Sequence, residues 1–112
     1  MKYIIAIIQP HRLEEVKEEL ENAGVHLITV SNILGRGRQK GYTEVYRNAR
    51  EVGLLKKTKI EIAVNEDFVQ PTIDAIMKGA HTGRTGYGKI FVLDLHEVVR
   101  IGTGERGGPA IG

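Results

Sequence analysis

The order in which two hydrophobic patterns recur along the chain constrains its fold more than any other feature. Apolar residues at helical spacing predict two amphipathic helices, one from Pro10 to a stop at Gly24 and another beginning near Pro71. Short apolar or alternating runs predict four strands, at residues 2–8, 25–34, 58–64 and 89–101. Two βαβ units with right-handed crossovers predict an antiparallel sheet with two helices on one face. This is the ferredoxin-like plait of the α+β class.

The same patterns predict side-chain directions. The inward stripes of the two helices are Leu13, Val16, Leu20 and Ala23, then Val69, Ile73, Ile76 and Ala80. In the third strand, Lys59 and Glu61 alternate with apolar residues, which predicts a half-buried strand. The isoleucine-rich run at residues 2–8 predicts a central strand buried on both faces.

Two helices on one face leave the other face of the sheet to be explained. If the strands alternate, Ile28, Val30, Ile62 and Phe91 cannot all point toward the helices. Apolar side chains on the second face therefore predict self-association. The pattern gives no symmetry.

The composition excludes several classes of protein. The length of 112 residues fits a single domain, residues 1–112, and no apolar run approaches the ~20 residues of a membrane span. The absence of cysteine excludes disulfides and thiolate sites, and it suits a cytoplasmic protein. The apolar start leads into a helix signal without a cleavage site, so we interpret it as a strand and not as a signal peptide.

Residues 36–56 predict a long functional loop. Glycines mark its start, basic residues recur to Arg50, and the segment lacks sustained periodicity. The last segment, residues 102–112, is rich in glycine and shows no core pattern, which predicts an irregular tail.

Two glycine-rich segments were candidates for phosphate binding. Residues 35–41 lack the spacing of the dinucleotide fingerprint, and residues 83–89 lack the hydroxyl residue of a P-loop because Ile90 follows Lys89. Glycine still lets successive N–H groups approach an anion. Residues 86–89 are therefore either a phosphate cradle or an ordinary turn between helix and strand.

The sequence contains no recognisable catalytic constellation. The histidines lack the spacing of a helical metal site, and Ser31 has no adjacent base; the histidines are His11, His26, His81 and His96. Phe91 alone does not reproduce the aromatic pattern of the RNA-recognition motif, so we expect no nucleic acid partner.

Two segments resemble the P-II family of nitrogen-regulatory signalling proteins. They are Gly35-Arg36-Gly37-Arg38-Gln39-Lys40-Gly41 through Arg47, and Thr82-Gly83-Arg84-Thr85-Gly86-Tyr87-Gly88-Lys89-Ile90-Phe91-Val92. The resemblance extends from Ile4 to Glu105. It implies a non-catalytic homotrimer with ATP or ADP between neighbouring subunits, and a loop at residues 36–56 that acts on a partner such as an ammonium transporter or a nitrogen-assimilation enzyme.

The resemblance also implies roles for individual residues. The nucleotide-binding residues are Thr29, Gly37, Arg38, Glu61, Gly86, Gly88, Lys89 and Arg100. Gln39 is implied to ligate Mg²⁺ together with the nucleotide phosphates, and Gln39, Gly41 and Lys57 are implied to hold 2-oxoglutarate. Such roles fit charge-assisted donors and the preference of Mg²⁺ for oxygen ligands.

Four residues depart from the family pattern. Glu51 and Ala49 stand where relatives carry a nucleotidylated tyrosine and a phosphorylated serine, so neither modification is expected. Tyr87 replaces an aspartate. Gly102 replaces the second arginine of an R-x-R pair, so only the first arginine, Arg100, remains. Losing one arginine contact weakens phosphate binding by about 1.5–3 kcal/mol.

Tyr87 and Gly102 leave open a P-II protein that senses another anion such as bicarbonate. A small phosphate-ester hydrolase is also open, because plaits host such enzymes and Arg38, Arg100 and Lys89 could grip phosphate.

Overall fold

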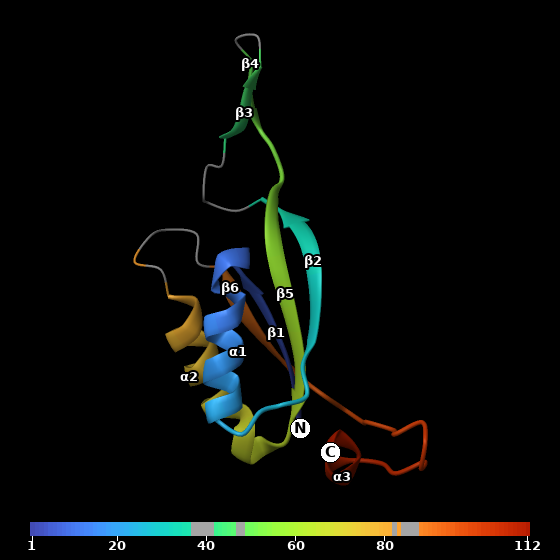
Figure 1. The fold of residues 1–112 in the computed structure, drawn as a ribbon. Coiled ribbons are helices and arrows are strands. Elements are labelled where there is room, and N and C mark those ends of the chain that lie inside the picture. Colours follow the sequence, from blue (N-terminus) through green and yellow to red (C-terminus); the bar gives the residue numbers. More distant parts are fainter. Residues whose placement is uncertain (37–41, 47–48, 82, 84–87) are drawn as a thin grey trace.

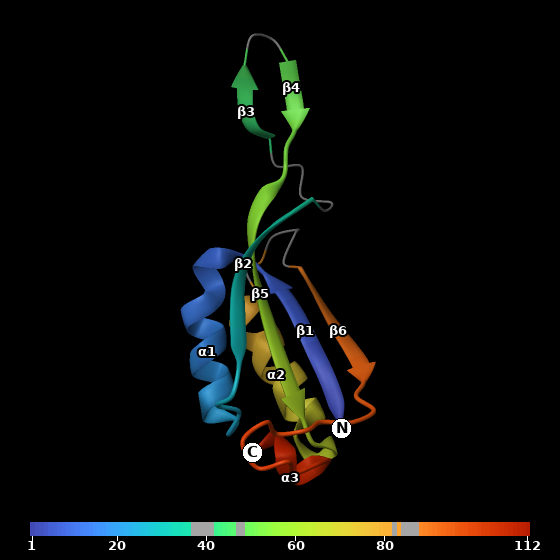
Figure 2. The same ribbon diagram turned by 90° about the vertical axis from the view of Figure 1, so that its right-hand side faces the viewer.

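The chain folds into an antiparallel sheet of four strands with two helices on one face (Figures 1 and 2). This computed structural model describes residues 1–36, 42–46, 49–81, 83 and 88–112. The strands in spatial order are β2 (Thr29–Gly35), β5 (Leu55–Val64), β1 (Lys2–Ile8) and β6 (Lys89–Asp94). The helices are α1 (Leu13–Asn22) and α2 (Val69–Ala80), which follow the short 3-10 turns η1 (Pro10–Arg12) and η2 (Glu66–Phe68). The predicted ferredoxin-like plait is confirmed.

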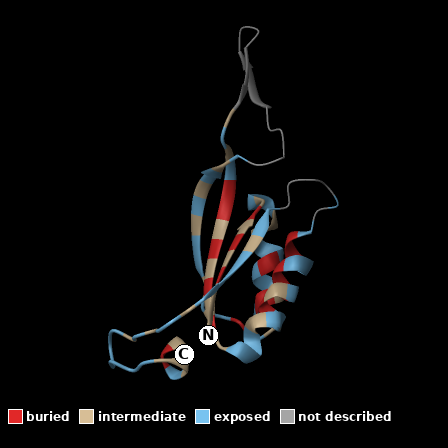
Figure 3. Cartoon of the chain, turned by 180° about the vertical axis from the view of Figure 1, so that it is seen from behind, coloured by how far each residue is buried: buried red, intermediate tan, exposed pale blue. Residues whose placement is uncertain are grey.

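The core lies between the helices and one face of the sheet (Figure 3). Ile4 is fully buried and pairs in register with Ile62 of β5 and Val92 of β6. Val16 and Leu20 of α1 cover this face, as their spacing predicts. Each buried aliphatic side chain contributes about 1.5–3 kcal/mol to the free energy of unfolding. Within the described residues, no helix is long and apolar enough to span a membrane.

The two helices approach each other closely at Gly79. A Cβ added there would lie 2.6 Å from the Val16 Cα and 2.8 Å from the Val16 amide nitrogen. Real Cβ atoms do not come so close, so the packing requires glycine despite its low helix propensity. Arg12 also donates a 2.9 Å hydrogen bond from Nε to the Gly79 carbonyl oxygen. The contact joins the start of the first helical segment to the end of α2.

The second face of the sheet is only partly covered within the chain. Tyr3, Ile5 and Ile7 of β1 are half-buried, so the prediction that this strand is buried on both faces is wrong for the single chain. Phe91 and Leu93 of β6 flank them and are 47% and 45% exposed. Ile62, by contrast, lies in the core. We call the face that carries Tyr3, Ile5, Ile7, Phe91 and Leu93 the open face.

The long segment between β2 and β5 contains regular structure that the sequence interpretation missed. Tyr42–Tyr46 (β3) and Ala49–Val52 (β4) form a two-stranded antiparallel sheet, which projects beyond the end of the main sheet (Figure 1). β5 begins at Leu55 and not at residue 58. The prediction of an irregular loop is therefore wrong for these residues. Tyrosine, threonine and valine favour strands, but the surrounding glycines and charges obscured that signal.

Three further boundaries differ from the prediction. β2 begins at Thr29 because residues 25–28 serve as the connection from α1, with Val25 buried in the core. β6 ends at Asp94, and Val99 instead forms an isolated bridge with Arg106. The tail contains a short helix, α3 (Gly108–Ile111), whose Ala110 is buried. Its apolar contacts are too few to give a periodic sequence signal.

Candidate functional site

Lys57, Gly88 and Lys89 lie near one end of the sheet, the end from which the β3–β4 hairpin projects (Figure 1). Ile7 of β1 pairs in register with Lys59 on one side and with Lys89 on the other. Register partners point to the same face, so these two lysines belong to the open face. Lys57 lies one alternation beyond Lys59 and pairs with Ile33 of β2. The structure thus places at one end of the sheet two lysines, Lys89 and Lys57, to which the resemblance gives separate roles in phosphate and oxoacid binding.

Lys57 is the most buried of these cations, with 7% of its surface exposed. Burial lowers the pKa of its ammonium group, because removal from water disfavours the charged form. A Cβ added at Gly35 would lie 3.5 Å from the Lys57 Cγ, so the side chain runs along the end of β2. An anion that contacts the ammonium group would restore part of the lost charge stabilisation.

Gly88 has a backbone conformation that excludes other residues. Its φ is +104°, and an added Cβ would overlap the carbonyl oxygen of Ile7. This close approach fixes the entry of the chain into β6 and the direction in which Lys89 starts. The geometry of Gly88 is compatible with both alternatives for residues 86–89, a phosphate cradle and an ordinary turn between helix and strand.

Gly88, Lys89 and Ile7 also border a mainly apolar cavity of about 400 Å³ between α2 and β6. Met77 of α2 and Val92 of β6 line it, and both are about half exposed. The cavity lies beneath the start of β6, on the side of the sheet that faces α2. Its walls offer a phosphate few polar partners, and the candidate anion-binding residues Gly88 and Lys89 are exceptions in this apolar lining.

Thr29 and Glu61 form a direct register pair between β2 and β5 on the open face. The Tyr3 hydroxyl donates a hydrogen bond to Oε2 of Glu61, and Lys59 Nζ lies 3.5 Å from Oε1. The tyrosine hydrogen bond, followed by the Lys59 charge, holds the pKa of Glu61 below its ordinary value, and the same hydrogen bond raises the pKa of Tyr3. Tyr3 was not among the predicted site residues, because only the strand register brings it to Glu61.

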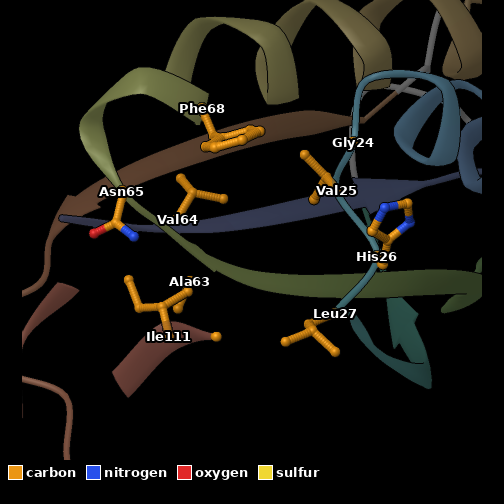
Figure 4. Close-up of a pocket in the computed structure, with 10 residues that line it drawn as sticks. Gly24, Val25, His26, Leu27, Ala63, Val64, Asn65, Phe68 and Ile111 are labelled. Carbon is orange, nitrogen blue, oxygen red and sulfur yellow. The ribbon is translucent and has the colours of Figure 1, made fainter. Parts of the chain in front are cut away.

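A small pocket lies next to this pair. Leu27 and Ala63 line it. Leu27 lies two residues before Thr29, and Ala63 lies two residues after Glu61. Figure 4 shows Ile111 of α3 close to Ala63, with Leu27 beside them and Phe68 on the opposite side. The cavity measures about 110 Å³, so it accommodates a few water molecules or one small chemical group and not a whole nucleotide.

The C-terminal segment closes one side of this pocket. Asn65 donates a 3.2 Å hydrogen bond from Nδ2 to the Gly108 carbonyl oxygen, which attaches α3 to the end of β5. A Cβ added at Gly112 would lie 2.9 Å from the Leu27 Cδ1 and 3.1 Å from the Arg100 Nη2. The tail is therefore ordered against the site, and the guanidinium of Arg100 lies beside it.

Arg100 lies at the start of a short arm, residues 100–105, that folds back on itself. Its amide donates a 2.9 Å hydrogen bond to the Glu105 carbonyl oxygen, and its guanidinium lies 3.7 Å from the Glu105 carboxylate. Ile101 at the tip is fully exposed. No described residue would come within 4 Å of a Cβ at Gly102, so a larger residue fits there. The arm presents one arginine where the resemblance implies two.

Arg100 and Lys89 lie toward opposite ends of the chain's sheet. Lys89 pairs with Ile7 at one end of β1, and Asp94 pairs with Lys2 at the other. At ~3.3 Å per residue, β6 alone extends about 17 Å, and Arg100 lies beyond it, near Leu27. The chain therefore does not bring these two phosphate-binding candidates to one point. The hydrolase alternative, in which Arg38, Arg100 and Lys89 grip one phosphate, gains no support from the fold of a single chain, because the fold separates Arg100 from Lys89.

Several predicted site residues lie outside the residues that the structure describes. They are Gly37, Arg38, Gln39, Gly41 and Gly86, together with Tyr87 among the departures. Ala49 and Glu51 lie in β4. Among the described residues, no group of three or more His, Asp or Glu side chains gathers as a metal site.

Comparison with known proteins gives the same family across the whole fold. The family model described as "Nitrogen regulatory protein P-II" matches residues 1–105. The chain is 54% identical to "Nitrogen regulatory protein P-II" of Azospirillum brasilense, over 99% of this chain and 100% of the relative. It is 54% identical to "Nitrogen regulatory protein GlnK1" of Methanosarcina mazei, over 99% and 97% of the two chains, and 49% identical to "Nitrogen regulatory protein P-II 1" of Escherichia coli, over 99% and 100%. The chain belongs to the P-II family of nitrogen regulatory proteins.

Proposed function

We propose that this protein is a cytoplasmic, non-catalytic sensor that binds ATP or ADP between subunits of a homotrimer. The loop at residues 36–56 then regulates a partner, such as an ammonium transporter or a nitrogen-assimilation enzyme. Family membership supports the regulatory role, because the named relatives are nitrogen regulatory proteins. The projection of the β3–β4 hairpin beyond the sheet supports the loop as the contact surface (Figure 1).

The observation that carries this proposal is the separation of Lys89 from Arg100. Lys89 lies at the end of the sheet near the hairpin, and Arg100 lies beyond the opposite end beside Leu27. One phosphate group can contact both only if they come from different copies of the chain. In a closed ring, each interface joins two different patches of identical subunits, so one end of a subunit can meet the other end of its neighbour. The split of the site thus supports a nucleotide cleft that two subunits share.

The open face supplies a reason for the chain to assemble. Ile5 and Ile7 are half-buried, and Phe91 and Leu93 beside them are about half exposed. Contact between open faces would bury these side chains at about 25 cal/mol per Å² of apolar surface. The exposed apolar area supports association without specifying the number of subunits, so the trimer rests on the family.

The described residues fit the implied ligands chemically. Lys89 and Gly88 offer a cation and a glycine-only backbone turn to the phosphates, and partly desolvated Lys57 offers a cation to 2-oxoglutarate. Gln39, Gly41, Gly37, Arg38 and Gly86 remain assigned by resemblance alone. Mg²⁺ bound to Gln39 and the phosphates would supply charge neutralisation at that end of the cleft.

Isothermal titration calorimetry of the full chain tests the ligands. We expect saturable binding of ATP or ADP, and binding of 2-oxoglutarate only when Mg²⁺ and ATP are present. Lys89→Ala should weaken nucleotide binding about tenfold or more, since one charge-assisted hydrogen bond is worth about 1.5–3 kcal/mol. Flat traces for every nucleotide at millimolar concentration would contradict the nucleotide assignment.

A second candidate is a P-II protein whose effector is another anion, such as bicarbonate. It is favoured by Gly102, which leaves Arg100 as the one arginine of the expected pair. A thermal-shift series with bicarbonate, 2-oxoglutarate and ATP separates the candidates. A ligand that binds only the native state raises the melting temperature in proportion to RT ln(1 + [L]/Kd).

A further inference from the structure

The Tyr3–Glu61 pair joins two strands across the open face. Tyr3 lies in β1 and Glu61 in β5, and the register sets Tyr3 opposite Ala63 and Glu61 opposite Ile5, so the hydrogen bond runs diagonally. The pair is partly buried, and 24% of the Glu61 side chain is exposed. A carboxylate in this position is already ordered before any ligand arrives.

Both oxygens of the Glu61 carboxylate have a protein partner. Oε2 accepts the Tyr3 hydroxyl hydrogen, and Oε1 faces the Lys59 ammonium group at 3.5 Å. An ionised carboxylate offers about four acceptor positions, so these contacts leave room for a further donor. The lowered pKa of Glu61 agrees with a carboxylate that stays ionised, and therefore acts only as an acceptor, near neutral pH.

The surroundings of Glu61 indicate which part of a nucleotide it meets. A negative carboxylate repels phosphate, whereas the lysines at positions 57 and 89 attract it at the hairpin end of the sheet. Glu61 lies four residues along β5 from Lys57, about 13 Å away, and next to Thr29 and the small pocket bordered by Leu27 and Ala63. A nucleotide with its phosphates at the lysines would therefore place its nucleoside part near Glu61.

We propose that Tyr3 is a positioning residue for nucleotide recognition: its hydroxyl fixes the Glu61 carboxylate so that Glu61 accepts a hydrogen bond from the nucleoside. The proposal rests on nucleotide binding as proposed above. The shared chemistry is a donor group, either the amino group of the base or a ribose hydroxyl. Without the tyrosine hydroxyl, Glu61 keeps its charge and Lys59 contact but loses the hydrogen bond that sets its direction.

The test compares the wild type with Tyr3→Phe, which removes only the hydroxyl. Dissociation constants are measured for ATP, for ITP, which lacks the amino group, and for 2′-deoxy-ATP and 3′-deoxy-ATP, each of which lacks one hydroxyl. We expect the wild type to prefer ATP over the analogue that lacks the relevant donor. Tyr3→Phe should weaken ATP binding roughly tenfold and bring that preference ratio close to one. Without the tyrosine hydroxyl, Glu61 is no longer held in the direction of the nucleoside donor, so the hydrogen bond between that donor and the charged carboxylate is lost.

A double-variant series shows whether Tyr3 acts through Glu61. On a Glu61→Ala background, which removes the acceptor, adding Tyr3→Phe should change the ATP dissociation constant less than twofold, whereas two independent effects would multiply. A melting temperature for each variant reports the structural effect separately, since a purely structural role does not alter the ratio between ATP and its analogues.

The outcomes are distinguishable from those of the proposed function. If the wild type binds neither ADP nor any of these four nucleotides, the proposed function fails and this inference falls with it. If the wild type binds ATP and its analogues equally well, or if Tyr3→Phe keeps the wild-type preference ratio, only the inference is overturned. Loss of preference in Tyr3→Phe, with no further effect of the tyrosine on the Glu61→Ala background, supports it.

Discussion

Gly88 lies so close to Ile7 that any side chain at this position would overlap the Ile7 carbonyl oxygen. The contact joins the start of β6 to the end of β1, where Lys89 and Ile7 are register partners. The same glycine therefore serves the sheet and the proposed phosphate cradle. Its φ of +104° adds a second reason why an L-residue is excluded.

Gly88→Ala tests this double role. Overpacking against rigid backbone should lower the free energy of unfolding by about 1–3 kcal/mol and should weaken ATP binding as Lys89 shifts. Gly83→Ala is the matched control: Gly83 also has a positive φ, of +76°, but no described residue would lie within 4 Å of its Cβ. Urea denaturation and calorimetry measure both effects. Equal stability and equal affinity in the two variants would contradict the contact.

Gly79→Ala should destabilise the packing of α1 against α2. The added Cβ would lie 2.6 Å from the Val16 Cα, so the helices must separate, at a cost of about 1–3 kcal/mol that exceeds the gain in helix propensity. Gly102→Ala is the control, because it adds the same methyl group in open space. A urea melt should move Gly79→Ala alone. An unchanged urea midpoint for Gly79→Ala would show that α1 and α2 lie farther apart at Gly79 than this distance to Val16 indicates.

Gly102→Arg should strengthen nucleotide binding. Arg100 is the one arginine present of the pair that the family resemblance implies, and position 102 has room for a larger side chain. One added charge-assisted contact is worth about 1.5–3 kcal/mol, or roughly 10-fold to 150-fold in affinity. Gly102→Gln, similar in length but uncharged, is the control. Calorimetry with ATP and ADP that finds no gain for the arginine would indicate that the arm does not reach the phosphates.

The Tyr3–Glu61 hydrogen bond should make stability depend on pH at both ends of the range. The folded-state pKa of Glu61 is lowered, so its contribution is present above the ordinary value of 4.5 and is lost as pH falls through the lowered pKa. The folded-state pKa of Tyr3 is raised, so its contribution is present below 10.0 and is lost as pH rises through the raised pKa. Melting temperatures of the wild type and Tyr3→Phe should therefore differ most between these limits. A difference that stays constant from pH 3 to pH 11 would contradict the pairing.

Lys57 should give 2-oxoglutarate binding an alkaline limit. Burial lowers the pKa of its ammonium group, and an anion binds the charged form, so affinity should fall as pH rises through the lowered pKa. Lys57→Arg keeps its charge at every pH used and should remove this limit, although its fork geometry can weaken binding at neutral pH. Titrations at pH 7 to 10 compare the two proteins. Parallel pH profiles would show that another group sets the limit.

Several features of the fold could be predicted because they depend on local periodicity. The alternation of Lys59 and Glu61 with isoleucines correctly placed the two charged residues on the open face. Val16 and Leu20 were correctly assigned to the core because their spacing marks one helix face. These patterns arise wherever a strand or helix has one buried side, so they are visible without a structure.

Other features depend on contacts between distant residues and were missed. Tyr3 meets Glu61 only through the β1–β5 register, and α3 is held by Asn65, 43 residues from Gly108. The β3–β4 hairpin gives no clear strand signal in the sequence, because glycines and charges surround its strand-forming residues. The prediction that β1 is buried on both faces is wrong for the single chain, because the helices cover only one face of the sheet and leave the open face half-buried.

The most direct test of the central claim, that two copies share each nucleotide site, is a complementation measurement. Lys89→Ala and Arg100→Ala are purified separately, then unfolded together and refolded as a mixture, and ATP binding is measured by calorimetry. Each variant alone should bind about tenfold more weakly or worse. In the mixture, a cleft between one subunit of each kind can regain both residues, so roughly one quarter of the clefts should bind with wild-type affinity if subunits combine at random. A mixture that binds no better than the separate variants would contradict a site shared between copies.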